Sequence, residues 1–170
     1  LKDISLIVKA NHSVIIVGPA SAGKSTLLRT LARCNDVQPD LRTWGTAQLS
    51  GRNWREAPAP AIVMQRAQLF IATVYENLNY GLAGRTDLSA VEKKDTIEAL
   101  LLRYGLDDIA KNMRQRVSQI PRATQRRLNL ARTLLCKPEL LMVDELTLDL
   151  DEPDRISVIQ FLKQAIENQS

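Results

Sequence analysis

The stretch GPASAGKST, residues 18 to 26, constrains the fold of this chain more than any other feature of the sequence. In the pattern G-x-x-x-x-G-K-[ST], a glycine-rich loop joins a buried strand to the start of a helix. That pattern is satisfied by Gly18, Gly23, Lys24 and Ser25. The apolar, β-branched run SVIIV precedes the loop and the helix-forming run KSTLLRTLA closes it, so the flanking elements fit as well. The sequence therefore predicts a phosphate-binding loop.

Each residue type in this loop has a physical role. Glycine lets the backbone curl, so that successive N–H groups and the N-terminus of the helix face an anion. We expect Lys24 to reach the β- and γ-phosphates of ATP, in catalysis as well as in binding, and the Ser25 hydroxyl to be a ligand of Mg²⁺. The expected cofactors are thus ATP and Mg²⁺. The cofactor-binding residues predicted in the loop are Gly18, Pro19, Ala20, Ser21, Ala22, Gly23, Lys24, Ser25 and Thr26.

A second candidate site follows an apolar run nearer the C-terminus, in LLMVDE at 140 to 145. Four apolar residues predict a buried parallel strand, and α/β sheets place ligand chemistry at the carboxyl ends of such strands. We expect Asp144 to meet the Mg²⁺ and Glu145 to polarise the water that attacks the γ-phosphate. Two acids after a strand are often only a solvated turn, but here they accompany a phosphate loop.

Strand and helix patterns alternate along the chain, which indicates an α/β fold. Apolar runs predict strands over 1–10, 13–17, 61–64 and 140–143, with short edge strands and turns over 39–60. Helices are predicted over 24–34, 89–104 and 121–136. The helix over 89–104 has the clearest ends, because Ser89 and Glu92 form a capping box and Gly105 closes it. Trp44 and Trp54 are interpreted as packing residues of a small β-lobe.

Composition excludes several classes of protein. The chain has 170 residues, 45% of them hydrophobic and 25% charged, which suits one globular domain. Its apolar runs are too short to cross a bilayer. The net charge of +4 is modest, and the basic residues between Arg114 and Arg132 carry no interleaved aromatics, so no nucleic-acid partner is expected. Because the sequence starts at Leu1 rather than Met, we expect a single domain truncated at both ends.

Three segments together resemble the nucleotide-binding domain of an ABC transporter. They are GPASAGKST at 18–26, IVMQRAQLFIATVYENLNYGL at 62–82 and QRRLNLARTLLCKPELLMVDELTLDLD at 125–151. The resemblance implies a P-loop NTPase of the ABC ATPase type, with a mostly parallel core sheet, a small antiparallel β-lobe and a helical lobe from about Ala72 to Arg126. It also implies that Gln65 is the Q-loop glutamine, a candidate catalytic, cofactor-binding and Mg²⁺-binding residue.

The resemblance further implies an activity and partners. The chain would be an ATP-binding and ATP-hydrolysing subunit that powers transport from the cytoplasmic face of a membrane. The segment LFIATVYENL at 69–78 would face transmembrane permease subunits. Asp151, in LDLD at 148–151, matches the D-loop aspartate, which faces a second nucleotide-binding subunit in this family.

The signature segment departs from the family pattern. Alignment of the helix that follows places IPRAT, residues 120–124, on the five positions that usually read LSGGQ and that close on ATP held by the other subunit. Pro121 replaces the serine and removes both a hydroxyl and a backbone N–H. Arg122 and Ala123 replace glycines, which hinders close approach of the backbone to a phosphate. Because proline suits the start of a helix, we expect the helix to form while phosphate donors are lost.

An intact phosphate loop beside a degenerate signature favours a heterodimer with one active and one degenerate site. A homodimer stays open, with Arg122 or Thr124 serving in an unusual signature. Two other functions also stay open. One is a soluble ABC-type ATPase, which the transporter-like segment 69–78 disfavours. The other is a non-hydrolysing regulatory module, which IPRAT favours and Glu145 disfavours.

Overall fold

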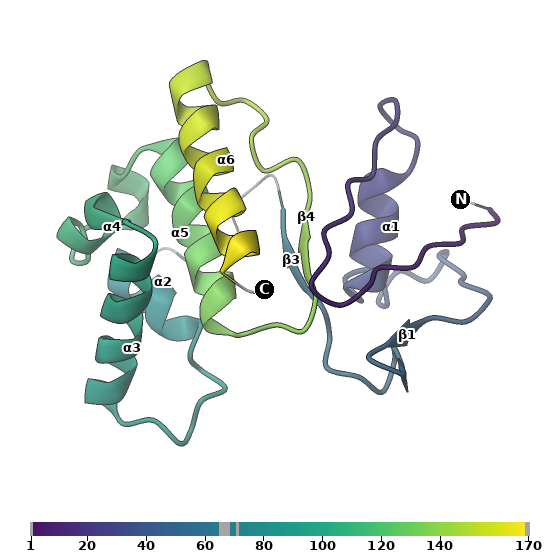
Figure 1. Ribbon diagram of the computed structural model, residues 1–170, viewed down its shortest axis with the longest axis horizontal. Helices are drawn as coiled ribbons and strands as arrows, with labels where there is room; N and C mark the ends of the chain where they lie inside the picture. Colours follow the sequence, from purple (N-terminus) through teal and green to yellow (C-terminus); the bar gives the residue numbers. More distant parts are fainter. Residues whose placement is uncertain (1, 65–68, 71, 169–170) are drawn as a thin grey trace. The chain divides into compact units, whose positions relative to one another are not determined.

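The computed structural model describes residues 2–64, 69–70 and 72–168 (Figure 1). Its helices are α1 (Lys24–Leu31), α2 (Val74–Tyr80), α3 (Ala90–Arg103), α4 (Asp107–Lys111), α5 (Arg122–Leu135) and α6 (Glu152–Glu167), with a 3₁₀ turn η1 (Val117–Gln119). Its strands are β1 (Gln48–Leu49), β2 (Arg52–Asn53), β3 (Ala61–Val63) and β4 (Leu141–Val143). β1 pairs with β2 and β3 pairs with β4, in separate two-stranded sheets.

The chain folds as two compact units. The phosphate-loop unit comprises Leu1–Ile62 and Glu139–Asp144, and the helical unit comprises Val63–Pro138 and Glu145–Ser170. The phosphate-loop unit therefore contains α1, the β1–β2 hairpin, β4 and all of β3 except its last residue. None of the helices described in either unit combines the length and apolar character needed to span a membrane.

The β1–β2 hairpin is antiparallel, with Gln48 opposite Asn53 and Leu49 opposite Arg52. Ser50 and Gly51 join the two strands with φ angles of 51° and 76°. Two central residues with positive φ suit the right-handed twist of a two-residue hairpin. The prediction of short strands and turns over 39–60 is thus confirmed.

The predicted strands over 1–10 and 13–17 are wrong, because the described residues of both segments form no strand. A strand requires a neighbour to complete its hydrogen-bond ladder, and β3 and β4 pair with each other rather than with either segment. The side chain of Val17 consequently remains exposed, as 87% of the residue is accessible to solvent. The following α1 contains no buried residue either, and it ends at Leu31 rather than near residue 34.

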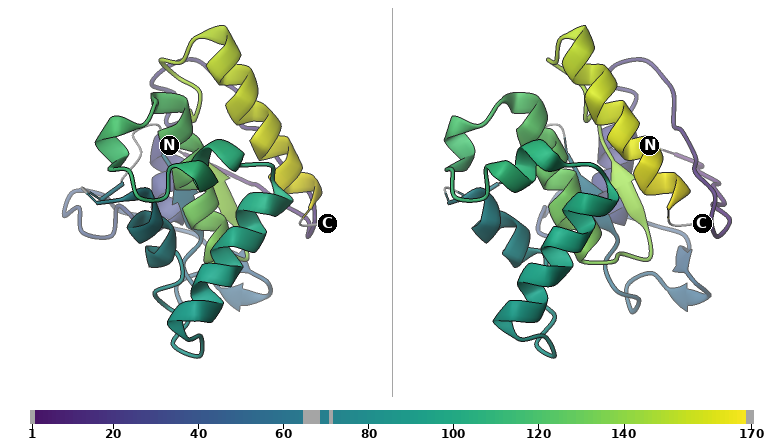
Figure 2. Two further views of the ribbon diagram at one scale, coloured as in Figure 1. Left: turned by 90° about the vertical axis from the view of Figure 1, so that its left-hand side faces the viewer. Right: turned by 60° about the vertical axis from the view of Figure 1, so that its left-hand side comes forward.

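In the helical unit, α5 is the central helix, because it contacts α2, α3, α4 and α6 (Figure 2). Its apolar face supplies the buried residues Leu128, Leu130 and Ala131. The surrounding helices contribute fully or nearly fully buried apolar side chains to the same unit: Val74, Leu78, Ile97, Leu101, Ile109, Val158 and Phe161. The predicted helix over 121–136 is confirmed, with Pro121 and Cys136 as the capping residues.

The predicted ends of α3 are also confirmed. The backbone N–H of Ser89 donates to Oε2 of Glu92 at 2.8 Å, and the N–H of Glu92 donates to Oγ of Ser89 at 3.3 Å. These two bonds are the reciprocal capping box. After the helix, Gly105 has a φ of 61°, and the N–H of Leu106 donates to the carbonyl of Leu101 at 2.9 Å, so the last turn closes in a left-handed residue.

The two tryptophans differ in whether their rings pack against other residues. Two guanidinium groups contact the ring of Trp54, with those of Arg33 and Arg55 at 5.5 and 5.2 Å from its centroid. Such cation–π contacts make Trp54 a packing residue of the hairpin region, as predicted. Trp44 is 86% exposed, so the prediction that it packs in the β-lobe is wrong. It follows Thr43 and precedes Gly45 in a segment without strand structure, which leaves no surface of a sheet to cover it.

Candidate functional site

The phosphate loop has the backbone of an anion site. Ser21 and Gly23 adopt φ angles of 61° and 92°, which turn the chain sharply into α1. Helix α1 begins at Lys24, as predicted, and no described side chain caps it. The first N–H groups of a helix lack partners inside the helix, and the helix dipole adds partial positive charge there. The start of α1 therefore offers donors to an anion such as a phosphate.

Lys24 is turned back over the loop. Its Nζ donates to the carbonyl oxygens of Gly18 and Pro19, each at 2.8 Å. The ammonium group is thus placed above the curled backbone, where it has carbonyl partners. Phosphate oxygens would be stronger partners for this ammonium than neutral carbonyls, because charge on both groups strengthens the hydrogen bond.

The structure brings together two predicted Mg²⁺ ligands that are 119 residues apart in the sequence. Oγ of Ser25 donates to Oδ1 of Asp144 at 2.8 Å. Asp144 is 5% exposed, and no other charged residue is buried in the part of the chain that the structure describes. Its other oxygen, Oδ2, lies 4.0 Å from Nη2 of Arg29. The end of β4 and the first turn of α1 therefore meet at a buried carboxylate and a hydroxyl.

This donor set fits Mg²⁺ in a nucleotide site. The ion prefers oxygen ligands and is usually held by one or two protein groups together with water and substrate phosphates. Among the described residues, no group of three or more His, Cys, Asp or Glu side chains could hold a metal ion by itself. A hydroxyl and a single carboxylate beside a phosphate loop match the first arrangement and not a metal cage made of protein ligands alone.

The other two predicted catalytic residues are Glu145 and Gln65, and the structure describes only the first. Glu145 is exposed and has a φ of 48°, an uncommon conformation for a residue other than glycine. Its backbone carbonyl accepts from the N–H of Leu148 at 3.2 Å, so Glu145 opens a tight turn directly after β4. Uncommon backbone conformations of this kind cluster at functional sites. Gln65 lies outside the described residues.

The signature segment forms the start of α5 despite its proline. Pro121 precedes the first helical residue, and its carbonyl accepts the N–H of Gln125 at 2.9 Å. The expectation that the helix survives the substitution is thus confirmed. Ala123 and Thr124 are buried in the helical unit, whereas Pro121 and Arg122 are exposed.

Asp151 has a structural partner that the sequence reasoning did not anticipate. Its carboxylate oxygen Oδ1 accepts the N–H of Asp154 at 3.0 Å and caps α6. Pro153 in the first turn is a further start signal. The sequence contains a signal for this capping role. Asp151 stands directly before the residues E-P-D, and an aspartate followed by an acidic residue and a proline is typical of a helix start.

An aromatic platform in the helical unit was also missed. The rings of Phe70 and Tyr80 meet edge to face at 4.5 Å, and the guanidinium of Arg132 lies 5.5 Å from the Phe70 ring. The fully buried Asn77 fixes this arrangement, because its Oδ1 accepts the N–H of Phe70 at 2.9 Å and its Nδ2 donates to the carbonyl of Thr73 at 2.9 Å. Burial lowers the pKa of Arg132 from its ordinary value. Asn77, within the helical segment VYENLNY, was the signal available in the sequence.

Comparisons with known proteins identify the family of the chain. The sequence profile of the ABC transporter family matches residues 1–148. The phosphate import ATP-binding protein PstB 2 of Shouchella clausii (strain KSM-K16) is 32% identical over 154 residues, which are 85% of this chain. A second relative, the phosphate import ATP-binding protein PstB 1 of Synechococcus sp. (strain JA-3-3Ab), is 28% identical over 175 residues.

A solved structure gives the same result for the fold. The structure of cbiO1 from Clostridium perfringens, part of the ABC transporter complex cbiONQ, superposes with a TM-score of 0.76 at 26% identity over 99% of this chain. This match confirms the expected ABC ATPase fold. The chain spans 57% and 62% of the two curated relatives and 66% of the solved one. On the match of its sequence profile over most of the chain, this protein belongs to the ABC transporter family.

Proposed function

We propose that this chain is an ATP-binding and ATP-hydrolysing subunit that powers a membrane ABC transporter. The observation that carries the proposal is the hydrogen bond between Ser25 and Asp144, at 2.8 Å beside the phosphate loop. A hydroxyl and a carboxylate that converge at the start of an uncapped helix suit Mg-ATP. Two relatives that carry ATP-binding in their names support the same function.

The proposed roles follow from this arrangement. Residues 18–26 would hold the phosphates, with Lys24 as the positive charge that acts in binding and catalysis. Ser25, Asp144 and Gln65 would bind Mg²⁺, and Gln65 would also contact the nucleotide. Bound Mg-ATP supplies the reactive γ-phosphate, and Glu145 would take the proton of the attacking water. Both units would belong to one ABC ATPase domain, with a helical lobe from about Ala72 to Arg126.

Two substitutions separate binding from turnover. We expect Lys24→Ala to weaken binding of Mg-ATP to the full-length subunit at least about 100-fold, because it removes the ammonium aimed at the phosphates. Glu145→Gln should retain ATP and lose turnover by about 100-fold or more in the assembled transporter, because a carboxamide is not a general base. Calorimetry measures the first effect and phosphate release the second, with Lys9→Ala as an exposed control.

Each outcome has a definite meaning. Equal binding of Mg-ATP by Lys24→Ala and the parent would contradict the phosphate-loop assignment. Parental turnover by Glu145→Gln would remove that residue from catalysis. A parent assembly that binds ATP tightly and never turns it over would favour the non-hydrolysing module instead.

We also propose that the helical unit docks on a transmembrane permease at the cytoplasmic face of a membrane. Phe70 and Tyr80 are 43% and 58% exposed, and partly exposed aromatics on a rigid base favour a protein contact. Ala72→Cys should crosslink to a cytoplasmic loop of the permease. Ala72 is a better position than Thr73, because the Thr73 hydroxyl accepts the N–H of Glu76 and caps α2. Failure to crosslink in a well-assembled complex would favour a soluble ATPase.

The nucleotide-binding partner is proposed to be a different chain. In a head-to-tail dimer, this chain would supply a complete phosphate loop to one site and the degenerate IPRAT segment to the other. The second site would then hold ATP and turn it over slowly, since loss of one phosphate donor costs about 100- to 1,000-fold in rate. Purification of the native assembly should yield two kinds of nucleotide-binding chain. A single kind, with activity unchanged when residues 120–124 are replaced by LSGGQ, would support the homodimer.

A further inference from the structure

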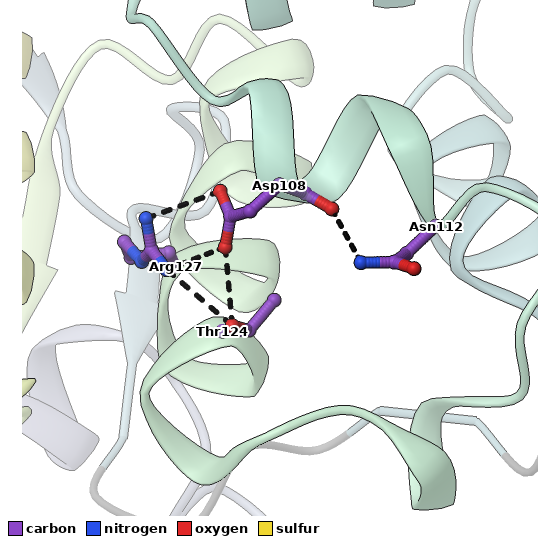
Figure 3. Close-up of polar contacts among 4 residues, drawn as sticks. All are labelled: Asp108, Asn112, Thr124 and Arg127. Atoms are coloured by element: carbon purple, nitrogen blue, oxygen red, sulfur yellow. Dashed lines mark hydrogen bonds and ion pairs between the residues drawn. The ribbon is translucent and has the colours of Figure 1, made fainter.

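A polar cluster joins α4 to the beginning of α5 and includes Thr124, the last residue of the signature segment (Figure 3). The carboxylate of Asp108 accepts from Nη1 of Arg127 at 3.2 Å and from Nη2 at 2.6 Å. It also accepts from Oγ1 of Thr124 at 3.2 Å. A paired guanidinium–carboxylate contact is among the stronger and more directional hydrogen-bonded arrangements in proteins. This contact links residues 16 and 19 positions apart, so it fixes one helix against another.

The hydroxyl of Thr124 makes two hydrogen bonds in this cluster. It donates to Asp108 and accepts from Nη2 of Arg127 at 3.3 Å. Thr124 is 5% exposed, and 17% of the Arg127 side chain is accessible. The backbone of Asp108 is held as well, because its carbonyl accepts from Nδ2 of Asn112 at 2.7 Å (Figure 3). The Thr124 hydroxyl is therefore engaged within the cluster, whereas Nε of Arg127 is buried and has no hydrogen-bond partner among the described residues.

The five signature positions, residues 120–124, fall into two groups according to whether their side chains are buried or exposed. Ile120, Ala123 and Thr124 are buried, and the one hydroxyl of the segment points to Asp108. Pro121 and Arg122 are exposed. Of the side chains in IPRAT, only these two are presented to a partner, and only that of Arg122 carries charge.

We propose that Asp108, Thr124 and Arg127 are positioning residues that fix the first two turns of α5, so that Arg122 and not Thr124 is offered to the ATP of the partner subunit. The cluster acts through α5 and does not touch the nucleotide. The proposal rests on the proposed function, because it assumes that residues 120–124 cover an ATP held by the second nucleotide-binding chain.

The same unit offers a matched control. Arg85 donates to Asp87 through Nε at 2.8 Å and through Nη2 at 2.6 Å, which is the same two-point contact between the same residue types. This pair is local, two residues apart, and more exposed than the Asp108 cluster on the arginine side. Asp87→Asn therefore removes an equivalent ion pair without altering the support of α5.

The test compares Asp108→Asn, Thr124→Val, Thr124→Ser and Asp87→Asn in the full-length chain. The first readout is hydrogen exchange of the backbone amides from Gln125 to Leu128. Asp108→Asn removes the charge that pairs with Arg127, and Thr124→Val removes the hydroxyl while keeping the shape. Both should speed this exchange about tenfold, the effect expected for loss of a charge-assisted hydrogen bond. Thr124→Ser keeps the hydroxyl and should exchange as the parent does, as should Asp87→Asn.

The second readout is release of radiolabelled ATP from the partner's phosphate loop in the assembled transporter. Asp108→Asn and Thr124→Val should speed release about tenfold, while Thr124→Ser and Asp87→Asn stay within about twofold of the parent. Arg122→Ala should speed release to a similar extent without changing amide exchange.

The outcomes distinguish failure of the positioning role from failure of the proposed heterodimer. Unchanged exchange in both Asp108→Asn and Thr124→Val would show that the cluster does not hold α5. Faster exchange with unchanged ATP release would overturn the positioning role. If the assembly contains one kind of nucleotide-binding chain, the heterodimer falls, and release is then measured from the homodimer, where the same order of variants is expected.

Discussion

The phosphate-loop unit and the helical unit are stabilised by different kinds of contact. The buried apolar residues of the phosphate-loop unit include Ala32, Ala57 and Met142, which are small or flexible side chains. The helical unit instead buries large branched side chains from each of its helices, among them Leu78, Ile97, Leu101, Ile109, Leu128 and Leu130. Burial of each such side chain contributes about 1.5–3 kcal/mol relative to exposure. Hydrophobic packing therefore stabilises the helical unit far more than the other.

Polar contacts partly replace a core in the phosphate-loop unit. Nη2 of Arg33 donates to the backbone carbonyls of Trp54 and Ala57, and Glu139 bonds both Arg52 and Ser50. The predicted phosphate loop, residues 18–26, and Asp144 thus lie on the less tightly packed unit, while the signature segment lies on the better packed one. A loop that must accept and release a ligand is expected to come from the part of lower local stability.

The largest effect that tests this contrast comes from matched truncations, Leu128→Ala and Val17→Ala. Leu128 is fully buried on α5, so its truncation should lower the free energy of unfolding by about 2–5 kcal/mol. Val17 is 87% exposed, and its truncation should change that free energy by less than about 0.5 kcal/mol. Chemical denaturation of the 170-residue chain measures both. A comparable loss for both variants would contradict the contrast and favour the buried strand that the sequence predicts over 13–17.

A smaller loss of stability is expected from a substitution at the contact between α2 and α5 in the helical unit. A Cβ added at Gly81 would clash with the backbone carbonyl of Arg132 and lie 3.1 Å from Cβ of Leu135, because α2 ends against α5. We expect Gly81→Ala to cost about 1–3 kcal/mol in the free energy of unfolding, as overpacking of a close helix contact does. Gly84→Ala is the control, since nothing lies within 4 Å of its added Cβ. Equal stability of the two variants by thermal unfolding would show that α2 and α5 are less closely packed.

The features predictable from the sequence are those set by neighbouring residues. The capping box of Ser89 and Glu92 and the left-handed Gly105 follow from local backbone chemistry, and both features are observed. The start of α1 at Lys24 follows from the glycine before it. The phosphate-loop pattern and the acid after the apolar run 140–143 predicted that Ser25 and Asp144 share an ion, and the structure brings the two side chains together.

The features that were missed depend on contacts between distant residues. An apolar run such as 13–17 predicts a strand, but its burial depends on a neighbouring strand that local pattern cannot supply. The proposed role of Thr124 depends on its hydrogen bond to Asp108, 16 residues earlier on another helix, and no local pattern indicates that these two side chains meet. The roles of Gln65 and Glu145 in catalysis stay predictions.

The smallest expected effect concerns the carboxylate that anchors the β1–β2 hairpin. Oε1 of Glu139 accepts from Nη2 of Arg52 at 2.5 Å, and Oε2 accepts from Oγ of Ser50 at 3.1 Å. The bond from Arg52 and then that from Ser50 hold the pKa of Glu139 below its ordinary value. Because the folded pKa is depressed, the carboxylate stabilises the unit above the unfolded pKa of about 4.3 and loses this effect as pH falls through the folded pKa.

In an NMR titration, Arg52→Ala should raise the pKa of Glu139 toward its ordinary value, whereas Arg55→Ala should leave it depressed. An unchanged titration in Arg52→Ala would mean that polar anchoring of the hairpin does not depend on this ion pair.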